Sequence, residues 1–222
     1  RSTLFPYTTL FRSRSQSINE SSNKFSISNL KHLGGAFWAI IIVNTIFMLS
    51  RMNETFLILR VNENFIADVA KAPIVMIIMN VGAILSSYPC GILGDKYDRT
   101  RMLFIAVIFL ILADAVMYGA TTTTMMYIGI FLWGIQVGAS QNVFYSLIAE
   151  KTPENLRGTG LGIYWFVNAI DAFFADTVAG TISHHISLKY VFVSSGSIGV
   201  LTLLVLMYLM RILNPTVKNP SK

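Results

Sequence analysis

The sequence of 222 residues is 54% hydrophobic and only 13% charged, whereas soluble domains carry about 25% charged residues. These proportions exclude an ordinary soluble domain and predict an integral membrane protein. The formal net charge of +6 does not favour nucleic-acid binding, because the basic residues lie between apolar segments rather than on one face. The single cysteine, Cys90, excludes a disulfide framework within the chain.

The N-terminal residues do not read as part of a fold. Residues 1–13, RSTLFPYTTLFRS, resemble the translation of a sequencing-library adapter, and we exclude them from fold reasoning. Such a junction implies a reading frame that is cut at its 5′ end. Residues 14–33 are polar and rich in serine, so we expect a disordered cytoplasmic linker there.

Six apolar segments are each long enough to cross a bilayer, whose core of about 30 Å needs about 20 apolar residues in a helix. We therefore expect an all-α membrane protein with a six-helix transmembrane domain over residues 34–213 and a cytoplasmic tail over residues 214–222. The expected spans are residues 36–59, 72–93, 102–120, 125–149, 159–182 and 190–213. Their length and the lack of period-two alternation exclude barrel strands.

The lysines and arginines predict the orientation. With the linker inside, the cytoplasmic side holds Arg14, Lys24, Lys31, Lys96, Arg99, Arg101, Lys151, Arg157, Arg211, Lys218 and Lys222. The outer loops hold only Arg60, Lys71 and Lys189. Because Lys and Arg accumulate in cytoplasmic loops, both termini are expected in the cytoplasm.

The charged segment Gly91–Arg101, GILGDKYDRTR, joins the second and third spans at the cytoplasmic face. Gly91 would let a helix end pack closely against a neighbour. Asp95 could accept hydrogen bonds at a helix start or pair with an arginine. Arg99 and Arg101 could pin the segment to other helix ends or to lipid headgroups.

This segment resembles the loop signature of the major facilitator superfamily, Gly-x-Leu-x-Asp-Arg/Lys-x-Gly-Arg-Arg/Lys. The residues that carry the resemblance are Gly91, Leu93, Asp95, Lys96, Arg99 and Arg101. Asp98 and Thr100 depart from the pattern. Residues 152–159, TPENLRGT, are similar to the start of the family's eleventh helix, and residues 50–60, SRMNETFLILR, are similar to the seventh helix of drug-efflux-like members.

The resemblance implies that the six spans are helices seven to twelve of a twelve-helix fold. It implies a secondary transporter of a small organic solute that is proton-coupled and efflux-like, works by alternating access, and lies in the bacterial inner membrane as a multi-pass protein. The expected partners are membrane lipid, the missing N-terminal six-helix half, the solute and, as candidate coupling ion, protons. The signature would act as a latch on one conformation; alternatively, it only sets the topology.

Ionisable residues at membrane depth are costly and usually functional. Arg51 and Glu54 are three residues apart, so on a continuous helix they would share a face and partly neutralise each other. Asn44, seven residues before Arg51, would extend the same polar stripe. This stripe is either one wall of a substrate cavity or a structural ion pair, and the sequence favours neither.

The fifth span carries Tyr164, Asn168 and Asp171 on one helical face, with Asp171 near the middle. An acid at that depth is a natural proton carrier facing the cavity, although it could instead bond to a neighbouring helix. Asp176 lies nearer the outer surface, where we expect it to be solvated. Asp114 on the third span either turns inward or reaches water at the outer end.

The fourth span offers uncharged polar groups. Gln136 and Gln141 are candidate solute contacts, although inter-helix hydrogen bonds would use the same groups. Two GxxxG pairs, Gly134 with Gly138 and Gly158 with Gly162, predict close helix contacts.

An enzyme is disfavoured. Asp171 and Asp176 lie on one helix and point about 140° apart, so they cannot face each other as intramembrane protease acids do. No hydrolase, metalloprotease or nucleotide-binding motif occurs. We expect no catalytic residue, cofactor or metal, since His184 and His185 have no visible further ligands. The remaining alternative is a non-transporting scaffold or receptor-like protein derived from a transporter.

Overall fold

The computed structural model describes residues 33–64, 72–96 and 99–213. All regular structure within these ranges is helical. The expected adapter at residues 1–13, nearly all of the linker at 14–33 and the tail at 214–222 lie outside the described residues.

The six expected segments are helical, except that the first one contains two helices instead of one. The helices are α1 (Gly35–Ser50), α2 (Thr55–Asn64), α3 (Ala72–Lys96), α4 (Arg99–Gly119), α5 (Thr123–Lys151), α6 (Arg157–His185) and α7 (Leu188–Leu213). A single 3-10 turn, Glu154–Leu156, lies between α5 and α6. The expected boundaries differ from these by a few residues, because polar residues such as Thr123 and His185 extend the helices past the apolar runs.

Four helical segments of the described chain are long and apolar enough to span a membrane: Gly35–Glu63, Ala72–Gly94, Arg99–Gly119 and Leu188–Tyr208. The helices α5 and α6 have 29 residues each, or about 44 Å at 1.5 Å per residue, so length does not exclude them. Their polar residues, Gln136 and Asp171 among them, lower their hydropathy. That all six segments cross the membrane and that both termini lie in the cytoplasm remain predictions.

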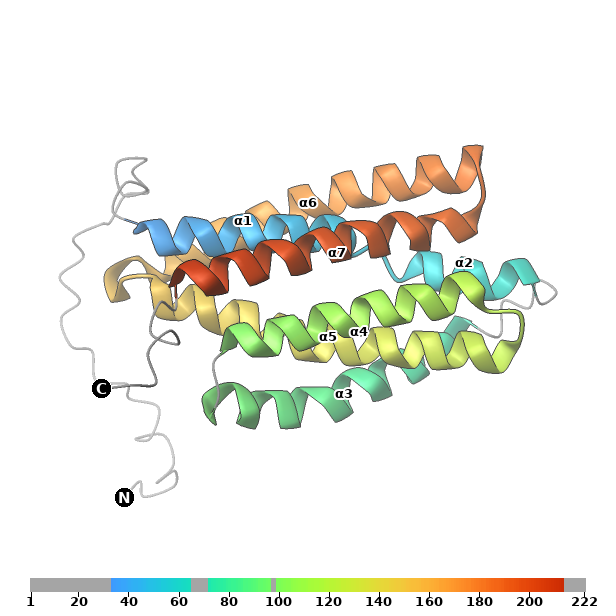
Figure 1. The fold of residues 1–222 in the computed structure, drawn as a ribbon, viewed down its shortest axis with the longest axis horizontal. Coiled ribbons are helices and arrows are strands. Elements are labelled where there is room, and N and C mark those ends of the chain that lie inside the picture. Colours follow the sequence, from blue (N-terminus) through green and yellow to red (C-terminus); the bar gives the residue numbers. More distant parts are fainter. Residues whose placement is uncertain (1–32, 65–71, 97–98, 214–222) are drawn as a thin grey trace, which may run out of the picture. The chain divides into compact units, whose positions relative to one another are not determined.

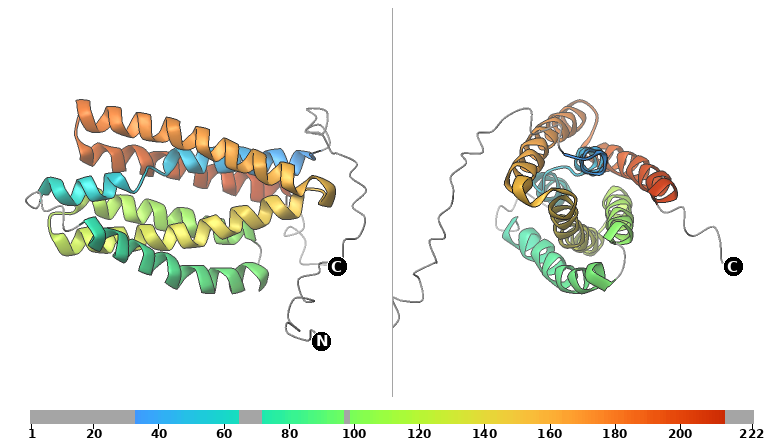
Figure 2. Two further views of the ribbon diagram at one scale, coloured as in Figure 1. Left: turned by 180° about the vertical axis from the view of Figure 1, so that it is seen from behind. Right: turned by 90° about the vertical axis from the view of Figure 1, so that its left-hand side faces the viewer.

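The helices from Leu33 onward lie side by side with their long axes roughly aligned (Figure 1). In the end-on view of Figure 2, α5 lies in the middle, with α3 on one side of it. The most extensive contacts join α3 to α5, α4 to α5 and α4 to α7, while α1 packs on α6 and α7. The ring centroids of Phe47 on α1 and Phe144 on α5 lie 5.2 Å apart.

Glycines allow the closest of these contacts. A methyl group at Gly134 would overlap the main-chain carbonyl of Met79, and one at Gly138 would overlap that of Ala83. The first GxxxG pair is thus confirmed as the place where α5 meets α3. The second pair is wrong as a contact site, since a methyl at Gly158 or Gly162 would meet nothing within 4 Å among the described residues.

The first expected span is not one continuous helix, and this corrects the sequence analysis. Residues 51–54 are not helical, and they separate α1 from α2. Arg51 has an extended backbone, with φ −92° and ψ 96°. Helical spacing therefore does not place Arg51 and Glu54 on a common face. Apolar periodicity could not reveal the break, because apolar residues continue on both sides of it.

The glycine contact predicts a large difference between two substitutions of the same kind. Gly134→Ala should destabilise the helical unit by about 1–3 kcal/mol, because main-chain atoms of α3 cannot move aside as a flexible side chain would. Gly162→Ala should be neutral or gain up to about 1 kcal/mol, since alanine favours a helix and the added methyl has room. Thermal unfolding of both variants in lipid nanodiscs provides the measurement. Equal stability of the two variants would contradict the α3–α5 contact.

Candidate functional site

The break between α1 and α2 is organised by side-chain oxygens at the start of α2. The Asn53 side chain accepts hydrogen bonds from the Thr55 N–H at 2.9 Å and the Thr55 hydroxyl at 2.7 Å. This is the local bonding by which asparagine favours a helix start. The Asn53 N–H in turn donates to Asp176 Oδ1 of α6 at 3.0 Å. Asp176 is partly exposed, as an acid near the outer surface would be, and in addition it forms this bond to the break.

Arg51 is the basic residue of this break. Its main-chain N–H still bonds to the carbonyls of Met48 and Phe47, both at 3.1 Å, which ends α1. Its guanidinium lies 5.4 Å from the centroid of the Trp133 ring on α5, within range of a cation–π interaction. Glu54 and Tyr164 are close enough to act on it electrostatically. Glu54 thus acts on the charge of Arg51 as expected, although the two residues do not lie on one helix.

The polar face of α6 is turned into the bundle. Tyr164, Asn168 and Asp171 are all buried and belong to the one buried stripe of that helix. Asn44 of α1 donates from Nδ2 to Asn168 Oδ1 at 2.6 Å, and Thr45 lies opposite Asp171. The shared face that the spacing predicts is present, and it packs on α1.

This face keeps unused hydrogen-bonding capacity. Among the described residues, Asn44 Oδ1, Asn168 Nδ2 and Asp171 Oδ2 are buried without a hydrogen-bond partner. The Trp133 ring nitrogen and Gln136 Oε1 on α5 are buried and unpartnered as well. Buried polar groups are normally paired, so a cluster of exceptions marks a place where polar ligands or a conformational change would be favourable. The arrangement brings together unpaired hydrogen-bonding groups, an aromatic face and one cation.

The two glutamines of α5 do not come together. Gln136 is fully buried and donates to Ser140 one turn along the same helix at 3.1 Å. Gln141 is exposed, five residues further on and about 140° away around the helix. Only one of them can therefore contribute to the cluster that contains Trp133, and the burial favours Gln136.

Known proteins share the sequence pattern behind this geometry. The family model described as the Major Facilitator Superfamily matches residues 36–222. The chain belongs to the Major Facilitator Superfamily. It is therefore a multi-pass integral membrane protein of a transporter family, and this membership indicates a transporter rather than an enzyme.

Several curated relatives are transport proteins of bacteria. A gentisate transporter of Corynebacterium glutamicum is 27% identical over 135 residues, which is 60% of this chain and 30% of that protein. The glucose transporter GlcP of Staphylococcus epidermidis is 29% identical over 86 residues, 39% of this chain and 19% of that protein. Multidrug resistance protein 3 of Bacillus subtilis is 27% identical over 122 residues, 54% of this chain and 24% of that protein. The aligned part thus spans less than a third of each of these relatives.

The facilitator loop signature is mostly helical in this chain. Gly91, Leu93, Asp95 and Lys96 belong to the last turns of α3, while Arg99 and Arg101 belong to the first turn of α4. Residues 97–98 and the side chains of Asp95 and Lys96 lie outside the described part. Arg99 Nη1 forms an ion pair with Glu150 Oε2 near the end of α5 at 3.2 Å. A methyl at Gly91 would meet nothing within 4 Å, so the expected close packing at Gly91 is wrong within the described chain.

Two other charged residues lie where the sequence did not place them: the sequence predicts Arg60 in an outer loop and leaves the position of Asp114 open. Arg60, expected in an outer loop, lies in α2 with its side chain fully buried, and it bonds Glu63 at 2.9 Å and the Met117 carbonyl at 3.4 Å. Asp114 turns inward, where its Oδ2 lies 2.6 Å from the Ser195 hydroxyl of α7. The sequence does not indicate the role of Trp133, because a tryptophan within an apolar run looks like any other apolar residue.

The bond from Asn53 to Asp176 predicts local opening of the break when the carboxylate is removed. In Asp176→Ala, the amide of Asn53 should exchange with deuterium about fivefold faster, which corresponds to about 1 kcal/mol for a partly exposed hydrogen bond to a charged group. Thr177→Ala is the control, because the Thr177 hydroxyl bonds only its own helix at the Phe173 carbonyl. Hydrogen exchange read by mass spectrometry measures both variants. Equal exchange at Asn53 in the two variants would show that Asp176 does not hold the break.

Proposed function

We propose that this chain is the C-terminal six-helix half of a secondary active transporter that moves a small organic solute by alternating access. The observation that carries the proposal is the cluster at the α1–α2 break, where Arg51 and Trp133 meet the buried polar face of α6. In transporters of this kind, the substrate site lies near the bilayer midplane and is built around discontinuous helices. The N-terminal half would supply the opposite wall.

The cluster suits an organic solute that combines a flat or apolar body with polar substituents. Arg51 offers a cation, Trp133 an aromatic face, and Tyr164 with Asn168 offer hydrogen bonds. Because Glu54 acts on Arg51 electrostatically, the site is not a simple anion trap. The relatives are named for gentisate, for glucose and for multidrug resistance, which supports a small-solute permease, and the last of these supports an efflux-like direction.

Protons are the coupling ion in this proposal, and Asp171 is the group that would carry them. It is the acid on the buried face of α6, and its Oδ2 has no hydrogen-bond partner among the described residues. A carboxyl group that is kept from water can exchange a proton when the two halves move apart. The ion pair between Arg99 and Glu150 would act as the latch between the α3–α4 turn and α5.

The membrane arrangement of the proposal has α5 and α6 crossing the bilayer with the other four segments. Their lower hydropathy fits helices that line a polar cavity rather than lipid. Both termini would lie in the cytoplasm of a bacterial inner membrane. The competing function is a scaffold or receptor-like protein derived from a transporter, and the bond between Asn44 and Asn168 is the contact that such a structural role would favour.

Asp171→Asn tests the coupling. In proteoliposomes that hold a complete transporter containing this chain, the variant should lose proton-driven flux by at least about tenfold, because an amide cannot release a proton. Solute exchange across the membrane without a proton gradient should persist. Asp176→Asn, on the same helix, should keep both activities. Unchanged driven flux in Asp171→Asn would remove Asp171 from this role.

The half-transporter proposal has a separate test. Proteoliposomes that contain only the 222-residue chain should show no solute uptake or efflux above protein-free vesicles, because one wall of a cavity cannot alternate access. Addition of a separately expressed N-terminal half should restore flux. Flux from the chain alone, with light scattering showing a monomer, would contradict the proposal.

A further inference from the structure

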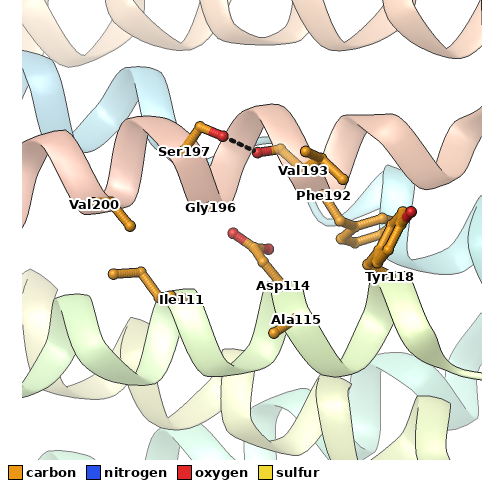
Figure 3. A pocket seen from close by; sticks show the side chains of 9 residues that line it. All are labelled: Ile111, Asp114, Ala115, Tyr118, Phe192, Val193, Gly196, Ser197 and Val200. Atoms are coloured by element: carbon orange, nitrogen blue, oxygen red, sulfur yellow. Dashed lines mark hydrogen bonds between the residues drawn. The ribbon is translucent and has the colours of Figure 1, made fainter.

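The carboxyl of Asp114 is a buried acid that the proposed transport site does not use. The residue is 2% exposed, and its side chain points from α4 toward Gly196 on α7 (Figure 3). It borders an open groove of about 250 Å³ along these two helices, whose remaining walls are largely apolar. Within residues 33–64, 72–96 and 99–213, Asp114 forms no ion pair. In the described part of the chain, Asp114 forms no hydrogen bond or ion pair with Arg51 or Trp133, so the proposed solute contacts do not explain its burial.

A short chain of hydrogen bonds connects this carboxyl to the end of α1. The Ser195 hydroxyl of α7 lies 2.6 Å from Asp114 Oδ2 and 2.5 Å from the main-chain carbonyl oxygen of Ser50. Ser50 is the last residue of α1, directly before the break. Three helices thus meet at one serine oxygen.

The number of hydrogen atoms decides the chemical state of this chain. A serine hydroxyl carries one hydrogen, and a main-chain carbonyl can only accept. The hydrogen between Ser195 and Ser50 must therefore come from Ser195. The hydrogen between Ser195 and Asp114 must then come from Asp114, because two oxygens 2.6 Å apart without a hydrogen between them repel each other. Both contacts are satisfied together only when Asp114 is a neutral carboxylic acid.

The surroundings also favour the neutral acid. Tyr118 on α4 lines the same groove as Asp114, Tyr190 on α7 packs on Tyr118, and Arg60 on α2 bonds the carbonyl of Met117, three residues along α4. Arg60 is engaged by Glu63 and the Met117 carbonyl, and Arg51, which follows Ser50, lies over Trp133. No described cation thus balances a carboxylate at this place, and a buried unpaired charge is strongly unfavourable. Oxygens 2.5–2.6 Å apart are also too close for a metal ion to lie between them.

The helix α7 provides the room for this contact. A methyl at Gly196 would lie 3.6 Å from Asp114 Cβ, and one at Gly199 would lie 3.1 Å from Ile111 and 3.5 Å from the Ser50 hydroxyl. Asp114 Oδ1 and the Ser50 hydroxyl are both buried without a hydrogen-bond partner among the described residues. These two oxygen atoms are thus available as hydrogen-bond partners when Asp114 gains or loses its proton.

We propose that Asp114 is a proton-binding site whose occupied form holds the end of α1 against α4 and α7. In this form Asp114 donates to Ser195, and Ser195 donates to the Ser50 carbonyl. When the proton leaves Asp114 Oδ2 for solvent, the Ser195 hydroxyl keeps its hydrogen and turns to donate it to the carboxylate, and the Ser50 carbonyl loses its donor. The end of α1 is then released at the break that carries Arg51. This inference concerns the chain alone and does not depend on which solute it moves or on Asp171.

Infrared difference spectroscopy on the 222-residue chain in lipid nanodiscs tests the site directly. At neutral pH, the spectrum of the chain minus that of Asp114→Asn should contain the C=O stretch of a carboxylic acid. In Ser195→Ala this band should persist at a shifted frequency, because the acid has lost its acceptor. A carboxylate band in its place would overturn the proposal. The spectra are compared in sodium buffer and in choline buffer, and a sodium-dependent loss of the acid band would replace the proton site by a sodium site.

Hydrogen exchange of the segment Met48–Phe56 tests the mechanical consequence. Asp114→Asn keeps a donor N–H₂ toward Ser195, so its segment should stay protected at every pH. In Ser195→Ala the donor to the Ser50 carbonyl is absent, and the segment should exchange about fivefold faster at matched neutral pH. As the pH rises and the acid band disappears, this segment of the unsubstituted chain should change from slow to fast exchange. Asp114→Ala is the control, because Ser195 can still donate to the Ser50 carbonyl there, and its segment should stay protected. If Ser195→Ala does not fold, loss of protection with rising pH in the unsubstituted chain but not in Asp114→Asn decides the link. Slow, pH-independent exchange in Ser195→Ala would overturn the link to α1.

Discussion

Main-chain polar groups at a helix end need partners outside that helix, and this constraint governs the interruption between α1 and α2. Four non-helical residues leave main-chain groups without helical partners. The Asn53 N–H is satisfied by Asp176 of α6, and the Ser50 carbonyl by Ser195 of α7. Arg51 between them lies over Trp133 of α5. The break is therefore held by three neighbouring helices, and a motion of any of them would be felt at Arg51.

The sequence predicted the helices well because the bilayer demands long apolar runs, and the runs end at clear polar signals such as Thr122 and Pro153. It also predicted a close helix contact at Gly134 and Gly138, although not that α3 would make it. It did not find the break at residues 51–54, since apolar residues continue on both sides of this short polar segment and the expected first span runs through it. The pair Gly158 and Gly162 shows the limit of the motif, because spacing alone does not say what a helix face meets.

The candidate site was predicted in part. Helical spacing placed Tyr164, Asn168 and Asp171 on one face, and the structure buries that face. The partners of these residues come from helices more than 100 positions away, as Asn44 does for Asn168, and spacing within one helix carries no information about them. For the same reason Asp114 stayed unexplained in the sequence: Ser195 is 81 residues distant, and a serine in an apolar helix is unremarked.

The central claim is that the polar face of α6 and the Arg51 break form one wall of a solute cavity. The most direct test is a cryo-electron microscopy structure of a complete transporter containing this chain, with its solute bound. The account predicts solute density in contact with Arg51 or Trp133 and with at least one of Tyr164, Asn168 and Asp171. Solute density elsewhere, with Arg51 and Asp171 turned toward acyl chains, would contradict it.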